Sequence, residues 1–210
     1  EGAKSSADAT HWKKAVELGA TLVTGARVLR ITLDHGGLAN GAEWMDEAGA
    51  IHFQSADVVL CAANGVGTPR LLLNSADAQF RDGLANRSGL VGKRLMLHPL
   101  AVVVGLFHEQ LESWQGPNGS SVQCLEFGKH DAARGFDLGA KWSLHPIGGG
   151  PMAESLKVLA EHGPGGDYHR RFAERMGHGL MWSVMCEDLP DERNRVELSD
   201  TLLVSSGMPA

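Results

Sequence analysis

The sequence is short of cysteine and of positive charge, and each shortage excludes a class of protein. Its 210 residues include 3 cysteines, which are too few and too widely spaced for a disulfide framework or a Cys-x-x-Cys metal pair. We therefore expect Cys61, Cys124 and Cys186 to be buried free thiols. Lys and Arg number 19 against 25 Asp and Glu, a net charge of −6, so no basic surface is available to neutralise phosphates and nucleic acid is not an expected partner.

A long hydrophobic run and a leader peptide are also missing. The longest apolar run, Leu95–Phe107, is interrupted by a His-Pro pair and a glycine, and it is shorter than the roughly 20 residues that cross a bilayer. The chain begins at Glu1 without an initiator Met or a cationic and apolar leader, so nothing assigns it to a compartment. Because it also ends at Ala210 before an element has closed, we expect it to be a piece of a longer protein.

What is present is the composition of a globular chain with short elements. Apolar residues make up 43% and charged residues 21%, a balance that supports a packed core and excludes intrinsic disorder. The 27 glycines and 8 prolines interrupt the chain at about one residue in six. We therefore expect many turns, and a bundle of long helices is excluded.

The first half predicts a helix followed by antiparallel strands. Apolar periodicity indicates a helix at 10–18, and a β-prone run indicates a short strand at 21–24. Alternating side chains from Arg27 onward, with turn signals at 34–37 and 47–49, predict a meander of three antiparallel strands.

A strand and a helix of another kind follow the meander. The run Val58–Ala63 is continuously apolar, which is typical of a parallel strand buried on both faces. After a Gly-rich turn, Thr68 is expected to be the N-cap of a helix with Pro69 at its first position.

The second half differs in composition, with a soft boundary near residue 99. An ordered Gly-rich loop at 84–92 leads to His98 just before that boundary. Downstream, the patterns predict strands at 101–107, 180–186 and 195–198 and helices at 151–161 and 168–176. The fold class is therefore α/β (α+β), with one parallel strand and an antiparallel meander.

The segment Gly65–Arg70 is the strongest candidate for a ligand-binding turn, because it follows the expected strand and opens a helix. Three interpretations stay open. The turn could cradle a pyrophosphate, connect a strand to a helix and do nothing else, or stay small because a cofactor comes close. Arg70 stands where the pyrophosphate fingerprint has its third glycine, which weighs against the first interpretation.

Histidine and serine patterns exclude two further chemistries. None of the 10 histidines stands at i, i+4 spacing around a carboxylate, as a zinc-binding helix requires. No Gly-x-Ser-x-Gly elbow is present, so hydrolase chemistry has no support. His98, which precedes Pro99 in the Gly-rich loop, is the histidine whose surroundings are most typical of a ligand site.

Segments along the chain resemble the sequence motifs of one enzyme family. They are Gly2–Ser6, Val23–Val28, Val58–Ser75 with its Thr-Pro pair, Leu84–Pro99, Glu187–Pro190, Asn194–Leu198 and Gly207–Ala210. Together they resemble the glucose-methanol-choline (GMC) family of flavin oxidoreductases, and in wording they are nearest to its bacterial sugar-acid and polyol dehydrogenase branch. Ser75-Ala76 departs from the usual Ser-Gly, and Arg94–His98 departs from the usual Asn-Leu-x-Asp-His.

The resemblance implies a partial FAD-binding domain at 1–99 and part of an antiparallel-sheet substrate-binding domain at 100–210. It implies FAD as the cofactor, with Val28, Ala62, Ala63, Gly65, Thr68 and His98 as cofactor-binding residues. It also implies hydride transfer to flavin from the CH–OH group of an alcohol, sugar or sugar acid, and it leaves room for an electron-acceptor partner. The family's Gly-x-Gly-x-x-Gly turn and its catalytic His are not in this sequence. We therefore assign no catalytic residue and expect the chain alone to be inactive.

The alternative is a non-catalytic α/β binding module or a partner subunit, in which the glycine turns only connect strands. A strand followed by Gly-x-Gly-x-x-Gly upstream of Glu1 would favour the flavoenzyme. Its absence would favour the module.

Overall fold

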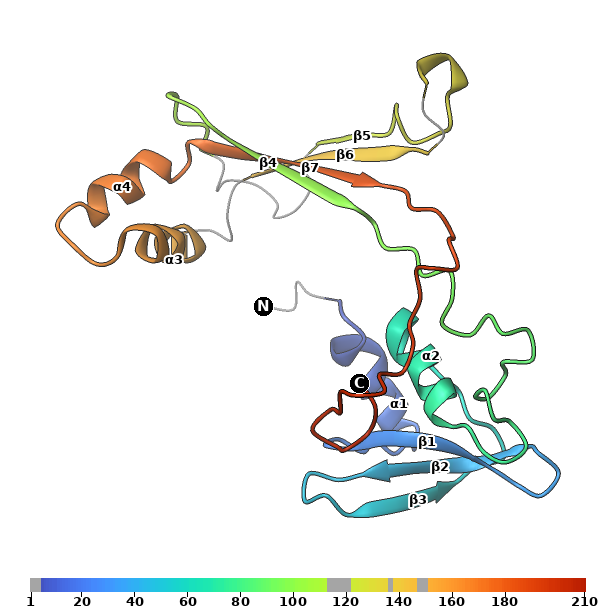
Figure 1. Cartoon of the computed structure of the whole chain (residues 1–210). Coiled ribbons are helices and arrows are strands. Elements are labelled where there is room, and N and C mark those ends of the chain that lie inside the picture. The colour runs from blue at the N-terminus through green and yellow to red at the C-terminus, as the bar shows by residue number, and fades with distance from the viewer. Residues whose placement is uncertain (1–4, 113–121, 136–137, 147–150) are drawn as a thin grey trace. The chain divides into compact units, whose positions relative to one another are not determined.

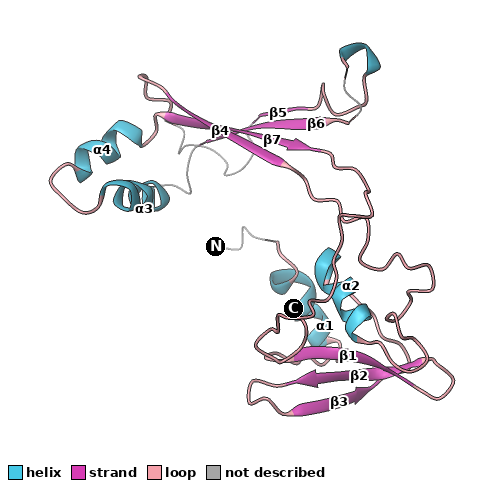
Figure 2. Cartoon of the chain, viewed as in Figure 1, coloured by secondary structure: helices cyan, strands magenta, loops and turns pink. Residues whose placement is uncertain are grey.

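The protein is described by a computed structural model, which covers residues 5–112, 122–135, 138–146 and 151–210. They form helices and two antiparallel sheets, the mixed α/β composition expected from the sequence (Figure 2). The chain divides into two compact units, of which the first is Glu1–Leu95 with Glu192–Ala210 and the second is Met96–Asp191. The assignment of the two halves to FAD-binding and substrate-binding domains stays a prediction.

The first unit contains the expected meander. Strands β1 (Arg27–Leu33), β2 (Ala39–Met45) and β3 (Ile51–Ser55) pair antiparallel in the order β1-β2-β3, as Figure 1 shows. Aspartates close both turns, because Asp34 Oδ1 accepts the Leu38 N–H and Asp46 Oδ1 accepts the N–H groups of Ala48 and Ala50, each at 2.9 Å. The three-strand prediction is confirmed.

Two helical segments complete the first unit. The helix expected at 10–18 is confirmed as a π-helical segment, Asp8–Trp12, that continues into α1 (Lys13–Glu17). Helix α2 (Asn64–Asn74) contacts β1 through Ser75, the residue that follows it. The Ser75 hydroxyl oxygen accepts the Ile31 N–H at 2.9 Å and its proton is donated to the Leu71 carbonyl at 2.7 Å. Both Ser75 and Ile31 are buried, so this hydroxyl joins the sheet to the helix.

Two expected strands of the first unit are wrong. The structure assigns no strand at 21–24, where Leu22 and Val23 are exposed, and none at 58–63. Val58 is 72% exposed and Leu60 is 87% exposed, instead of buried on both faces. An apolar run forms a strand only when a neighbouring strand forms hydrogen bonds with its N–H and C=O groups. No described segment pairs with 58–63.

The start of α2 also differs from the prediction. The helix begins at Asn64 rather than after Thr68, so Pro69 lies inside it. Asn64 caps the first turn, since its Oδ1 accepts the N–H groups of Val66 and Gly67, both at 2.9 Å. Asparagine is among the residues that tolerate a left-handed backbone, and Asn64 has φ 65°. This cap replaces the one expected at Thr68.

The second unit is built on a four-stranded antiparallel sheet. Its strands are β4 (Leu100–Leu106), β5 (Val122–Cys124), β6 (Ala140–Pro146) and β7 (Gly179–Cys186), in the order β4-β7-β6-β5. Strands β4 and β7 confirm the predictions at 101–107 and 180–186, whereas β5 and β6 were not predicted. The strand expected at 195–198 is wrong, because that segment has only one isolated bridge, between Arg195 and Lys93 in the first unit.

Two helices form a hairpin in the second unit. Helices α3 (Pro151–His162) and α4 (Tyr168–Arg175) confirm the expected helices. The Glu154 carboxylate is 3% exposed and accepts from Arg175 Nε at 2.9 Å. The same guanidinium lies beside Glu161, and this contact lowers the pKa of the Glu161 carboxyl and raises the pKa of Arg175. The hairpin is thus joined by a charged network beside the fully buried Val158.

Few apolar side chains are buried in the described residues. The buried ones are Ile31, Leu84 and Val158. The three cysteines are free, as expected, but they are half-buried rather than buried. Among the described helices, none is long and apolar enough to cross a membrane.

Candidate functional site

A cavity in the first unit joins two of the predicted cofactor-binding residues. It has a volume of about 280 Å³ and lies between the start of β1, which contributes Val28 and Leu29, and the beginning of α2. Ala63, Gly67, Arg70, Leu71, Asn74 and Met208 complete its lining. Val28 and Ala63 are 35 positions apart in the sequence, and the packing of α2 on β1 brings them to one cavity.

Thr68 shapes the backbone next to this cavity. Its Oγ1 accepts the Ala63 N–H at 3.1 Å, so a side chain within α2 holds the residue that precedes the helix. The Asn64 cap holds the next two N–H groups. The segment from Ala63 to Gly67, where α2 begins, is therefore held by the side-chain acceptors of Asn64 and Thr68.

The two glycines of this turn have different surroundings. A Cβ added at Gly67 would lie 3.2 Å from the Ala63 Cβ, whereas a Cβ added at Gly65 would meet nothing within 4 Å. Gly65 also has no left-handed φ that would demand glycine. The packing of the described chain therefore explains Gly67 but leaves the space at Gly65 open.

Sequence reasoning did not identify Arg70 or Met208 as residues of this cavity. The Arg70 guanidinium donates to the Pro209 carbonyl, with Nε at 3.2 Å, and Met208 lines the cavity beside it. The contact spans 139 positions, and no local pattern in the sequence signals it. The residue that replaces the third glycine of the fingerprint thus fastens the end of the chain to α2.

His98 belongs to the second unit, whereas the cavity at α2 is formed by residues of the first. Its Nδ1 is 3.4 Å from the Cys186 carbonyl oxygen, and the side chain lines a separate cavity of about 290 Å³. Of the six predicted residues, Val28 and Ala63 line the cavity at α2. Ala62 precedes α2, Gly65 and Thr68 lie in its first turns, and His98 is assigned to the other unit.

A second hollow of the first unit is lined by none of the predicted residues. It measures about 690 Å³ and lies between the start of β1, the β2–β3 turn and Ser205 and Ser206. Asp46 at its edge pairs with His52 at 2.8 Å, and that hydrogen bond, followed by those from the Ala50 and Ala48 N–H groups, lowers the pKa of the Asp46 carboxyl. The Asp46 side chain is 32% exposed and that of His52 is 43% exposed, so they form a surface pair rather than a proton donor poised near neutral pH.

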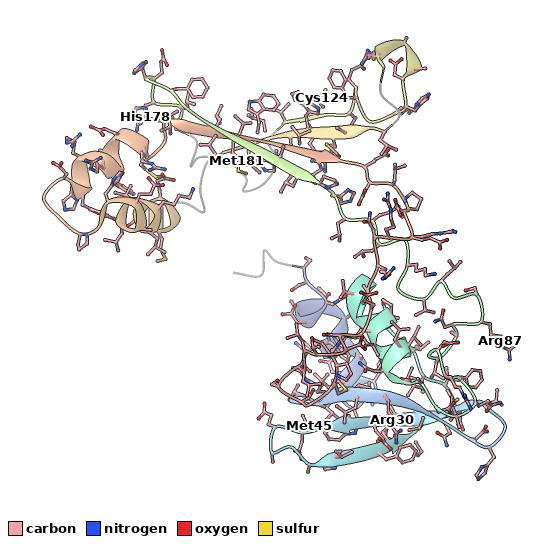
Figure 3. The ribbon with its side chains drawn as sticks, in the orientation of Figure 1. Arg30, Met45, Arg87, Cys124, His178 and Met181 are labelled. Atoms are coloured by element: carbon pink, nitrogen blue, oxygen red, sulfur yellow. The ribbon has the colours of Figure 1, made fainter. Side chains whose placement is uncertain are left out.

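Two further carboxyls of the first unit with lowered pKa values also form surface pairs. Arg30, labelled in Figure 3 on β1, donates from Nε to Glu43 on β2 at 2.8 Å and lowers the pKa of that carboxyl. Arg94 and Lys93 lower the pKa of the Glu192 carboxyl in the same way. Across the part of the chain that the structure describes, no three His, Cys, Asp or Glu side chains converge on a metal site. The cavity at α2 is therefore defined by its shape and its backbone rather than by ionisable groups.

Comparisons with known proteins find one family. Residues 1–100 match the family described as GMC oxidoreductase. The chain is 40% identical over 212 aligned residues to a 2-methyl-1,2-propanediol dehydrogenase of Mycolicibacterium austroafricanum, an alignment that covers 100% of the chain and 38% of that protein. It is 30% identical over 201 residues to the fructose dehydrogenase large subunit of Gluconobacter japonicus, over 93% of the chain and 36% of that protein.

A shorter alignment leads to the same family. Over 103 residues the chain is 35% identical to an uncharacterized GMC-type oxidoreductase of Mycobacterium tuberculosis, which corresponds to 49% of the chain and 15% of that protein. The chain thus spans well under half the length of each of these relatives. The family match agrees with the two dehydrogenases, which align with nearly the whole chain, and with the segments that suggested the family from the sequence. The chain belongs to the GMC oxidoreductase family.

Proposed function

We propose that this chain is the middle part of an FAD-dependent oxidoreductase that oxidises the CH–OH group of an alcohol or sugar by hydride transfer to flavin. The observation that carries the proposal is the cavity at α2, which Val28 and Ala63 both line. The names of two relatives support the substrate class, since one is a diol dehydrogenase and the other a subunit of a fructose dehydrogenase.

The residues around the cavity fit the edge of a flavin nucleotide. Strand β1 lies at the edge of its sheet, so the backbone groups on its side away from β2 pair with no described strand. The Ser75 hydroxyl accepts the Ile31 N–H on that side. The backbone groups around Val28 therefore stay available to contact the adenine. Arg70 does not point a free guanidinium at the cofactor, because it donates to the Pro209 carbonyl.

The first turn of α2 has room for a flat ring at Gly65. A backbone without a Cβ lets a ring approach closely, and at Gly65 no atom of the described chain occupies the space that a Cβ would fill. In the proposal, Ala62, Ala63 and Gly65 contact the cofactor through their backbone and small side chains. Thr68 holds Ala63 in place through its hydroxyl. His98 stays a predicted cofactor-binding residue, contributed by the second unit.

Bound FAD would supply the acceptor for the hydride, and this chain would supply walls and anchors. The small-molecule alcohol or sugar is the proposed substrate, and an electron-acceptor partner would reoxidise the flavin. A strand followed by Gly-x-Gly-x-x-Gly in the coding sequence upstream of Glu1 is the expected source of the pyrophosphate site.

The test is the flavin content of the full-length protein with Gly65→Val. A valine side chain would fill the open space, so we expect FAD binding to weaken by about tenfold or more, the equivalent of about 1.4 kcal/mol. Gly165→Val is the matched control, because Gly165 also has nothing within 4 Å and lies in the second unit, in the loop between α3 and α4. Flavin per chain is read from absorbance after gel filtration. Equal flavin in both variants and in the wild type would reduce the Gly65 turn to a connector.

A further inference from the structure

Strand β4 leaves one edge of the sheet in the second unit open. Its one described partner is β7, which lies beside it in Figure 1. At one end of this strand pair the Phe107 N–H donates to the His178 carbonyl at 2.8 Å, and at the other end the Cys186 N–H donates to the Pro99 carbonyl at 3.0 Å. The register between these bonds is continuous, so every second residue of β4 directs its N–H and C=O groups away from β7, namely Leu100, Val102, Val104 and Leu106.

Two other sheet edges of this chain are short or occupied. Strand β5, at the opposite end of the same sheet, has only 3 residues, and short edge strands limit pairing with further strands. In the first unit, the Ser75 hydroxyl accepts the Ile31 N–H on the outer side of β1. Strand β4 has neither protection, because it is 7 residues long and no described group accepts from its outward N–H groups.

The side chains of β4 indicate what kind of segment fits this edge. Leu100 and Leu106 share one face of the strand and are 58% and 57% exposed, while Val103 on the other face is also exposed. Side chains of neighbouring strands contact one another on the same face of a sheet. A segment that pairs with β4 therefore covers these side chains only if it carries apolar residues on both of its faces.

We propose that the outer edge of β4 pairs with an apolar strand from the part of the same polypeptide that lies outside these 210 residues. The chain aligns with only 38% and 36% of the two dehydrogenase relatives, so proteins of this kind have more than half of their length available to supply it. A strand of the same polypeptide acts at an effective concentration on the order of millimolar, which favours it over a strand from a second copy. The inference rests on the proposed function only in taking this chain as part of a longer protein.

The experiment compares amide hydrogen exchange along β4 in the 210-residue chain and in the full-length protein, resolved to single residues by fragmentation in a mass spectrometer. In the dilute, monomeric chain, the amides of Val102 and Val104 should exchange about tenfold or more faster than that of Val103, because only the Val103 N–H points toward β7. In the full-length protein, exchange at Val102 and Val104 should slow by about tenfold or more, since both amides then donate to the added strand.

Val104→Pro tests the edge directly, because proline removes an outward N–H and leaves the hydrogen bonds to β7 in place. In the full-length protein it should speed exchange at Val102 and Leu106 by about tenfold or more. Val104→Ala is the matched control, since it shortens the side chain but keeps the N–H, and it should leave exchange at both amides slow. Unchanged exchange at Val103 in the isolated chain checks that the β4–β7 ladder is intact in each variant.

Three results would overturn the proposal. The first is exchange at Val102 and Val104 that is as fast in the full-length protein as in the chain, or already slow in the monomeric chain. The second is protection in the full-length protein that fades on dilution, which would assign the edge to a second copy. The third is equal exchange in Val104→Pro and Val104→Ala. If Val104→Pro does not fold, the comparison of the two wild-type proteins still decides. The assay does not measure flavin, so its failure would leave the FAD proposal to its own test.

Discussion

Gly92→Ala is expected to loosen the attachment of the C-terminal segment to the rest of the first unit. Gly92 has φ 85°, and a Cβ there would lie 2.2 Å from the Val196 carbonyl oxygen, while the Val196 N–H donates to the Gly92 carbonyl at 2.8 Å. A left-handed alanine costs about 1–2 kcal/mol, and displacing Val196 forfeits a backbone hydrogen bond worth about 0.5–1.5 kcal/mol. The expected destabilisation of this attachment is therefore about 2–3 kcal/mol.

The assay is amide hydrogen exchange at Val196 and at Leu95, whose N–H donates to the Asn194 carbonyl at 2.9 Å. Exchange at both amides should accelerate by about thirtyfold or more in Gly92→Ala. Gly89→Ala is the control, because Gly89 has φ 67° but open space where its Cβ would lie, so it isolates the cost of the backbone angle. Equal acceleration in the two variants would refute the role of the contact with Val196.

Two further predictions concern the first unit and the chain as a whole. Ser75→Ala should lower the free energy of unfolding by about 1–3 kcal/mol in a urea titration, because the buried Ile31 N–H loses its acceptor. Ser88→Ala is the control: it removes an exposed hydroxyl that accepts the Leu90 N–H at 3.3 Å, and it should change the free energy of unfolding by about 0.5 kcal/mol or less. Equal midpoints would contradict this reasoning. The 210-residue chain alone, mixed with FAD, should neither co-elute with stoichiometric flavin nor reduce a dye with sugars, polyols or sugar acids, since the proposed site would hold only one edge of the cofactor. Either activity would show that the cofactor site is misplaced.

The meander was predictable because its signal is local. Alternating side chains in Arg27–Leu33 and the aspartates at the turns specify strands and reversals within a few residues. Helices α3 and α4 were predictable for the same reason, since each carries its own apolar spacing. The prediction of a buried strand at 58–63 was wrong because a continuous apolar run favours burial but does not specify which segment packs on it.

The candidate site was predictable in part. The resemblance pointed to Val28 and Ala63, and the packing of α2 on β1 brings both to one cavity. The cap was assigned to Thr68 because Ser, Thr, Asn and Asp are near-equal caps, and the left-handed Asn64 four residues earlier takes that role. The roles of Arg70 and Met208 in the cavity could not be predicted from the sequence. Their contacts join segments about 140 positions apart and produce no periodic pattern.

The place of β4 at the end of its sheet bears on how this chain behaves in solution. In the order β4-β7-β6-β5, β4 pairs with β7 and leaves its other edge without a described neighbour. Its sequence, Leu100–Leu106, has no Lys, Glu, Pro or bulge to discourage pairing, and its side chains are exposed on both faces, Val103 at 63% and Val104 at 53%. Such an edge is a template for a strand from another copy, so self-association will limit the solubility of this chain wherever β4 is left uncovered.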